Sequence, residues 1–125
     1  MNKIGAASAH LGRADEAINY YHSALNIRPN YVRVWVNLGI AHGFKGDYDE
    51  AARFYLNSLS FRPDAKHIWS YLHTTFMNLQ RYDLIQLISQ QNAQAFKEYD
   101  VIDAKELPEP ELNYKISTER HILNK

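Results

Sequence analysis

The chain contains no cysteine, so no disulfide framework can stabilise it, and this composition is typical of a reducing compartment. It also lacks long hydrophobic runs: no uncharged apolar stretch approaches the roughly 20 residues that span a bilayer. The first residues carry Lys3 but no apolar segment typical of a secretory signal. We therefore expect a soluble, intracellular protein that does not span a membrane.

An excess of charge of either sign is missing too. Lys plus Arg and Asp plus Glu number 14 each, so nothing global indicates binding to nucleic acid or to an acidic membrane surface. The six histidines show no His-x-x-x-His spacing, and we find neither a phosphate-binding glycine loop nor a glycine elbow around a serine. These absences favour a protein that is not an enzyme and has no metal or cofactor. His42 is expected to serve in packing.

One fixed spacing recurs along the chain instead. It relates the following identical pairs: Gly5 and Gly39, Glu16 and Glu50, Ala17 and Ala51, Tyr21 and Tyr55, Leu25 and Leu59, Pro29 and Pro63, Trp35 and Trp69, Leu38 and Leu72, Tyr48 and Tyr82, Asp49 and Asp83. A constant period of about 34 residues with two helices per unit resembles the tetratricopeptide repeat, a family whose members bind peptides. The resemblance implies an all-α fold of helical hairpins in a right-handed superhelical solenoid.

Apolar periodicity and helix-breaking residues place the helices. In the first unit we expect one helix over 2–11, ending before Gly12, and a second over 14–27. In the second unit we expect helices over 31–45 and 49–61, with a turn at Gly46. Pro29 and Pro63 should end the second helix of each unit. Small residues such as Gly39 should let the two helices approach closely, with Tyr55 filling the space beside them.

The third unit departs from the pattern, since His73 stands where a glycine is expected. We interpret it as a C-terminal capping helix pair, with a short helical piece over 93–99. The expected organisation is therefore a repeat over 1–30, a repeat over 31–64, a degenerate repeat or cap over 65–99, and a polar, flexible tail over 100–125. Met1 occupies the register of the two tryptophans, so we expect the first repeat to be incomplete and the chain to be part of a longer array.

Specific runs resemble one family within the repeat proteins. The run Asn2-Lys3-Ile4-Gly5-Ala6 is similar to the Trp-Asn-Lys-Leu-Gly-Ala motif of the peroxisomal import receptors for type-1 targeting signals. The run from Tyr31 to Ile40 resembles the next repeat of that family, and the run from Ile68 to Leu72 resembles the start of its C-terminal helical segment. The resemblance covers about residues 1–99.

This resemblance implies a function and a site. In the family, asparagines form hydrogen bonds with the backbone of a C-terminal tripeptide of the Ser-Lys-Leu type, while a Lys and an Arg attract its terminal carboxylate. Those roles fall here on Asn2, Lys3, Arg33 and Asn37. Phe44 departs from the pattern, because the family often has another asparagine there. The resemblance further implies cargo proteins as partners, docking proteins bound through regions outside this chain, and a cytoplasmic location with cycling to the peroxisomal membrane.

The residues themselves are consistent with peptide binding. Arg33 and Asn37 are four residues apart, so both project from one face of a helix. An asparagine amide donates and accepts, and so can pair with both groups of an extended backbone. An arginine can form a charge-assisted bond with a carboxylate.

Three other functions remain open. One is a co-chaperone module that clamps acidic C-termini, which also has an asparagine two residues before the glycine, as Asn37 precedes Gly39. That module needs a Lys and an Arg where this chain has His67 and Tyr71. It also needs another Asn where this chain has Ala6. A repeat array that selects substrates for an enzyme elsewhere in a longer protein, or a purely structural scaffold, has no distinguishing residue in this sequence.

Overall fold

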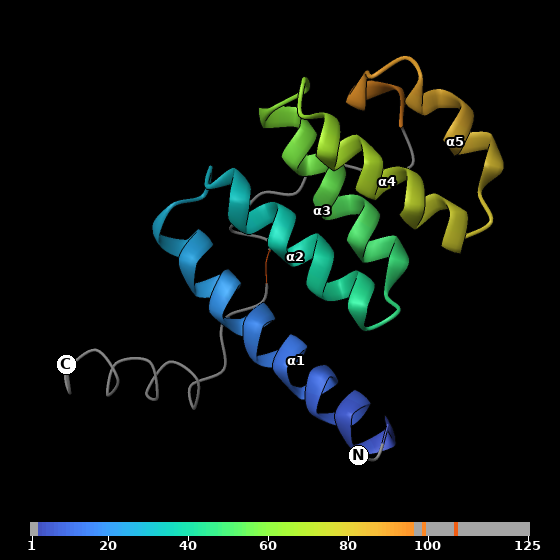
Figure 1. The fold of residues 1–125 in the computed structure, drawn as a ribbon. Coiled ribbons are helices and arrows are strands. Elements are labelled where there is room, and N and C mark those ends of the chain that lie inside the picture. Colours follow the sequence, from blue (N-terminus) through green and yellow to red (C-terminus); the bar gives the residue numbers. More distant parts are fainter. Residues whose placement is uncertain (1–2, 97–98, 100–106, 108–125) are drawn as a thin grey trace.

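The structure is a computed structural model that describes residues 3–96, 99 and 107, with side chains from residue 12 onward. All regular elements in this part of the chain are helices: α1 (Lys3–Ile27), α2 (Val32–Phe44), α3 (Tyr48–Phe61), α4 (Lys66–Asn78), α5 (Tyr82–Ile88) and the short 3-10 helix η1 (Ala93–Ala95). Consecutive helices pack side by side in chain order, and η1 returns to α3 (Figure 1). The expected all-α repeat fold is confirmed.

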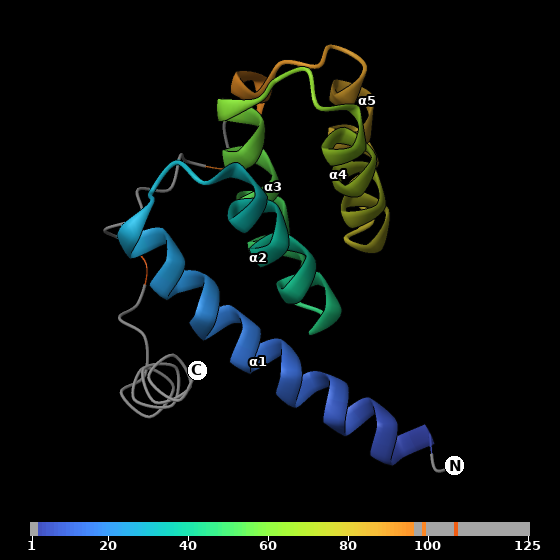
Figure 2. The same cartoon turned by 60° about the vertical axis from the view of Figure 1, so that its left-hand side comes forward.

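The first unit differs from expectation, because α1 is one continuous helix of 25 residues. The predicted break before Gly12 is wrong. A glycine inside a helix costs about 1 kcal/mol relative to alanine, and α1 contains no proline that would enforce an end. The N-terminal part of α1 extends past the other helices (Figures 1 and 2). Residues 5 and 21 correspond to Gly39 and Tyr55 of the next unit, but because α1 is continuous they lie about 24 Å apart along one helix axis.

The second unit forms the expected hairpin of α2 and α3. Gly46 turns the chain with φ of +84°, a conformation that L side chains rarely adopt. The N–H of Asp47 then donates to the carbonyl oxygen of His42 at 2.9 Å. Further along the hairpin, α2 and α3 approach so closely that a Cβ on Gly39 would lie 2.5 Å from Cε1 of Tyr55. The predicted contact between this glycine and this tyrosine is confirmed.

The third unit repeats that turn without a glycine. Gln80, which occupies the repeat position of Gly46, takes φ of +57°. The N–H of Arg81 donates to the carbonyl oxygen of Phe76 at 3.0 Å, as its counterpart does one repeat earlier. The packing between repeats therefore holds a non-glycine residue in the left-handed region, which is unfavourable for L-residues. The capping helix pair of α4 and α5 forms as predicted.

The two tryptophans of the repeat make the same hydrogen bond in successive units. Nε1 of Trp35 donates to the carbonyl oxygen of Pro29 at 2.8 Å, and Nε1 of Trp69 donates to that of Pro63 at 2.9 Å. Both tryptophans are buried. Each tryptophan therefore joins the first helix of a unit to the proline turn that precedes it, which fixes how consecutive hairpins stack.

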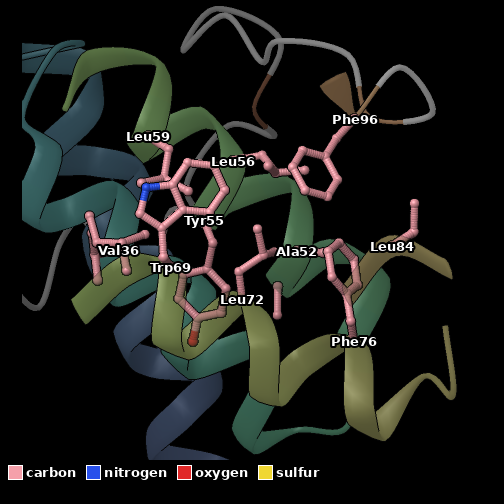
Figure 3. Close-up of a cluster of buried hydrophobic side chains, with 12 residues drawn as sticks. Val36, Ala52, Tyr55, Leu56, Leu59, Trp69, Leu72, Phe76, Leu84 and Phe96 are labelled. Atoms are coloured by element: carbon pink, nitrogen blue, oxygen red, sulfur yellow. The ribbon is translucent and has the colours of Figure 1, made fainter. Parts of the chain in front are cut away.

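The core runs through the helical stack as two clusters of buried side chains. The larger one lies between α2, α3, α4, α5 and η1, and Figure 3 shows its aromatic and aliphatic members pointing toward one another. Phe96 closes this cluster at the C-terminal side, with its ring 5.7 Å from that of Phe76 and 6.2 Å from that of Trp69. The hydroxyl of Tyr99 donates to Oδ1 of Asp49 at 3.2 Å. The segment after α5 thus covers the ends of α3 and α4.

The smaller cluster lies between α1, α2 and α3 and includes Leu25, Trp35 and Phe54. Leu107 packs against it, and is the residue of the expected tail over 100–125 that the structure describes. The remaining residues of that tail lie outside the described part. None of the helices within the described residues is both long and apolar enough to cross a lipid bilayer.

Candidate functional site

A groove of about 400 Å³ runs between α2 and α4, the first helices of two consecutive hairpins. Residues of α2, of α4 and of the turn before α4 form its walls: Val32, Arg33, Val36, Asn37, Ile40, Arg62, Ala65, His67, Ile68 and Tyr71. Two of the four predicted site residues, Arg33 and Asn37, are among them. The structure therefore places them together in one hollow.

The repeat register explains why the two walls face each other. His67 lies one repeat period after Arg33, and Tyr71 lies one repeat period after Asn37. The same two helix positions therefore line the groove from α2 and from α4. Each pair is four residues apart on its helix, so both members project toward one face.

The groove carries positive charge that no acidic side chain of its own lining balances. Arg33 and Arg62 are exposed, and neither makes an ion pair with another described residue. By contrast, Nη1 of Arg53, outside the groove, lies 2.9 Å from Oε1 of Glu50. Unpaired guanidinium groups beside a hollow are suited to bind a carboxylate from another molecule.

Ring contacts hold the α4 wall of the groove in place. The ring of Tyr71 lies 5.8 Å from that of buried Tyr55, and the His67 imidazole meets Tyr71 edge-on at 5.9 Å. Burial, followed by the nearby Tyr71, raises the pKa of Tyr55 to about 12, so its hydroxyl stays protonated at neutral pH. Tyr71 itself remains 40% exposed, and its ring forms an accessible apolar surface in the groove.

A second hollow, of about 260 Å³, adjoins the first between α1 and α2. Arg13, Ala14, Tyr21, Asn37, Ile40, Ala41 and Phe44 line it. Asn37 and Ile40 belong to both linings, so the two hollows adjoin along α2. Phe44, which stands where the resembling family often has an asparagine, lines the second hollow, whose lining is mainly apolar.

The side chains of the other two predicted residues are not among those that the structure describes. Asn2 lies outside the described residues. Lys3 is the first residue of α1, and its side chain is not among those described. Because α1 is continuous, the backbone of Lys3 lies about 36 Å along the helix from the end that leads into α2 near Arg33. Within the described residues, the site predicted from the sequence is reduced to Arg33 and Asn37.

Part of the groove lies outside the site that the sequence predicts. His67 and Tyr71 follow from Arg33 and Asn37 when one repeat period is added, but in the sequence they stand out only as departures from a co-chaperone clamp. Ile40, one turn beyond Asn37 on α2, could have been inferred from helical spacing. Arg62 lies in a turn, so no helical pattern identifies it.

Two buried histidines, His22 and His42, lie outside the groove. The imidazole of His42 stacks on Phe54 at 5.1 Å, as its aromatic register predicts. Nε2 of His22 and Nδ1 of His42 are buried and make no hydrogen bond with a described residue, and Oδ2 of Asp47 lies 3.7 Å from Nδ1 of His42. Burial lowers the pKa of both histidines. No group of three metal-ligating side chains occurs among the described residues.

Comparison with known proteins adds two findings. A family model described as tetratricopeptide repeat matches residues 1–64, just over half of the chain. A stretch of 40 residues, 32% of this chain, is 45% identical to a peroxisomal targeting signal receptor of Kluyveromyces lactis, and 42% identical to proteins of that name from Candida glabrata and Saccharomyces cerevisiae. The match covers only 6–7% of the length of these relatives.

Proposed function

The chain belongs to the tetratricopeptide repeat family, and from this premise we propose that its α2–α4 groove binds the extended C-terminal end of a partner protein through the terminal carboxylate. The observation that supports this most is the unpaired Arg33 beside Asn37, on one face of α2, in a hollow whose described lining contains no acidic side chain. Repeat modules of this family mediate protein interactions, and we propose that this one binds its partner without catalysing a reaction.

The chemistry of the groove matches the end of a peptide. The Arg33 guanidinium can bind a carboxylate in a bidentate arrangement, which is stronger than a neutral hydrogen bond. The Asn37 amide can donate to a peptide carbonyl and accept from a peptide N–H. Ile40 and Tyr71 offer apolar contact for side chains of the same peptide. An extended chain could therefore bind with its backbone at Asn37 and its terminus at Arg33.

We propose further that the bound ends are peroxisomal targeting signals of the Ser-Lys-Leu type, and that the chain is part of a cytoplasmic receptor that cycles to the peroxisomal membrane. The short match to the targeting signal receptors supports this, as do the residues carried over from that family. Docking proteins would contact other regions of such a receptor. Asn2 and Lys3 stay candidates for the same site.

Fluorescence anisotropy with a labelled peptide ending in Ser-Lys-Leu tests the proposal directly. We expect saturable binding to the chain, and a loss of about tenfold or more when the peptide carboxylate is amidated, since a hydrogen bond to a charged group contributes about 1.5–3 kcal/mol. Arg33→Gln and Asn37→Ala should each weaken binding without changing the circular dichroism spectrum.

Arg53→Gln is the matched control, because it removes the same charge outside the groove. Equal affinity for the free-acid and amidated peptides would contradict carboxylate recognition. Binding that survives in Arg33→Gln but not in Arg53→Gln would locate the site elsewhere. A preference for acidic chaperone-type C-termini over Ser-Lys-Leu would favour the co-chaperone alternative.

A further inference from the structure

The groove contains more cationic groups than one terminal carboxylate needs. Arg33 contributes a guanidinium from α2, and Arg62 contributes a second from the turn between α3 and α4. A carboxylate bound in bidentate fashion occupies one guanidinium face. With Arg33 assigned to the peptide terminus, Arg62 has no anionic partner in the groove.

Arg62 is well placed to hold a second anion. Its backbone N–H donates to the carbonyl oxygen of Ser58 at 3.0 Å, and its own carbonyl oxygen accepts from the N–H of Ala65 at 3.3 Å. The turn therefore fixes the backbone while the side chain stays exposed. The acidic residue of the same turn, Asp64, does not line the groove and forms no ion pair with Arg62.

His67 adds a second polar donor to the same wall. It lies in the second position of α4 and lines the groove together with Arg62. Its ring meets that of Tyr71 edge-on, and an imidazole N–H can donate a hydrogen bond to an anion. The α4 side of the groove therefore combines a guanidinium, an imidazole and an exposed aromatic ring.

Resting on the function proposed above, we propose that Arg62 and His67 form a second anion subsite, which selects peptides with an aspartate or glutamate ahead of the C-terminal tripeptide. Arg33 lies on α2 and Arg62 in the turn before α4, on different walls of the groove. An extended peptide whose terminal carboxylate is held by Arg33 can therefore reach Arg62 only with a side chain that precedes its last residues.

The test measures a ratio of affinities, so it does not depend on the absolute strength of binding. Fluorescein-labelled peptides ending in Ser-Lys-Leu carry glutamate, or glutamine as the neutral match, at one of the three positions before the tripeptide. We expect the glutamate peptide to bind about threefold to fivefold more tightly at low salt at one position or more, as is usual for an exposed ion pair. The preference should decline as ionic strength rises.

Variants of Arg62 assign the preference to this subsite. Arg62→Gln should reduce the ratio to about one, and Arg62→Glu should reverse it in favour of a peptide with lysine at the selected position. Lys66→Gln is the matched control: it removes a positive charge from the start of α4 at a residue that does not line the groove, and it should leave the ratio unchanged.

The outcomes separate this inference from the proposed function. If glutamate and glutamine peptides bind equally at all three positions, while both still require the free carboxylate, the second subsite is refuted and the terminal carboxylate site stands. A glutamate preference that persists in Arg62→Gln also refutes it. If neither peptide binds the unaltered chain, both proposals fall.

Discussion

Replacing Gly39 by alanine tests how closely the α2–α3 hairpin is packed. The new Cβ would lie 2.5 Å from Cε1 and 2.7 Å from Cδ1 of Tyr55, distances that real Cβ atoms essentially never show. Tyr55 is only 5% exposed and belongs to the larger core cluster. Its ring is also in contact with Tyr71, so it has little room to move away.

The expected magnitude is the difference of two opposing effects. Alanine stabilises a helix interior by about 1 kcal/mol relative to glycine. Overpacking a well-packed core costs about 1–3 kcal/mol, occasionally more, and contact of one Cβ with two atoms of a buried ring puts this site at the upper end. We expect Gly39→Ala to lower the free energy of unfolding by about 2 kcal/mol. For a chain of this length the midpoint of thermal unfolding should fall by about 8 °C.

Two other glycines provide matched controls within the same protein. A Cβ at Gly12 would meet nothing within 4 Å, and one at Gly43 would meet only the Cβ of Ala51 at 3.8 Å. Both lie in helices, so alanine should raise the free energy of unfolding by about 0.5–1 kcal/mol at each. Urea denaturation followed by circular dichroism measures all three variants against the unaltered chain.

A double variant connects the loss of stability to the ring. In Gly39→Ala combined with Tyr55→Leu, the clash is removed, so the two changes should cost less together than the sum of their separate effects. If Gly39→Ala proves as stable as Gly43→Ala, the close approach of α2 and α3 is wrong. Strict additivity in the double variant would likewise refute the assigned contact.

Two further predictions concern stability. Trp35→Phe should cost about 1–3 kcal/mol in urea denaturation, because it removes a buried hydrogen bond to Pro29 as well as packed ring atoms; an unchanged midpoint would contradict that role. Burial lowers the pKa of His22 and His42 in the folded chain. Near the ordinary histidine pKa of 6.5 the unfolded chain therefore binds more protons than the folded chain. The free energy of unfolding should then fall as pH decreases from about 7 through 6.5. The variant with both histidines changed to glutamine should flatten this slope between about pH 7.5 and 5.5, and an unchanged slope would contradict the assignment.

The sequence predicts the second and third units well because the determinants are local. Glycine and proline mark where a helix must end, and the repeat period transfers those marks from one unit to the next. The predicted ends of α2 and α3 agree with the structure to within one residue. The contact of Gly39 with Tyr55 follows from the same reasoning, since only a residue without a side chain permits that approach.

The errors arise where packing decides against a local preference. Gly12 occupies the register of Gly46 yet stays helical, because a glycine permits a turn without enforcing one. Gln80 shows the reverse case: it turns the chain with positive φ although it is not a glycine. No reading of single residues distinguishes these two outcomes, since each depends on whether the following helix can pack against the preceding one.

The candidate site, too, could be predicted from the sequence only in part. Arg33 and Asn37 could be placed by their helical spacing and by resemblance, and His67 and Tyr71 follow from the repeat period. Arg62 could not be found in this way, because its position relative to α2 depends on how the α3–α4 turn lies over the groove. The predicted roles of Asn2 and Lys3 depend on residues whose side chains the structure does not describe.

Several packing positions keep their residue from one repeat to the next, whereas the facing groove positions of α2 and α4 change. Packing positions are identical one period apart: tryptophan at 35 and 69, leucine at 38 and 72, proline at 29 and 63. The groove positions differ: arginine at 33 becomes histidine at 67, and asparagine at 37 becomes tyrosine at 71. The shared helical geometry brings both sets to the same places, so a change at a groove position alters the lining of the groove without altering how the hairpins stack. Under the proposed function, a bound peptide would meet a cation and an amide on one side and aromatic and imidazole rings on the other. This asymmetry would fix the direction in which the peptide lies.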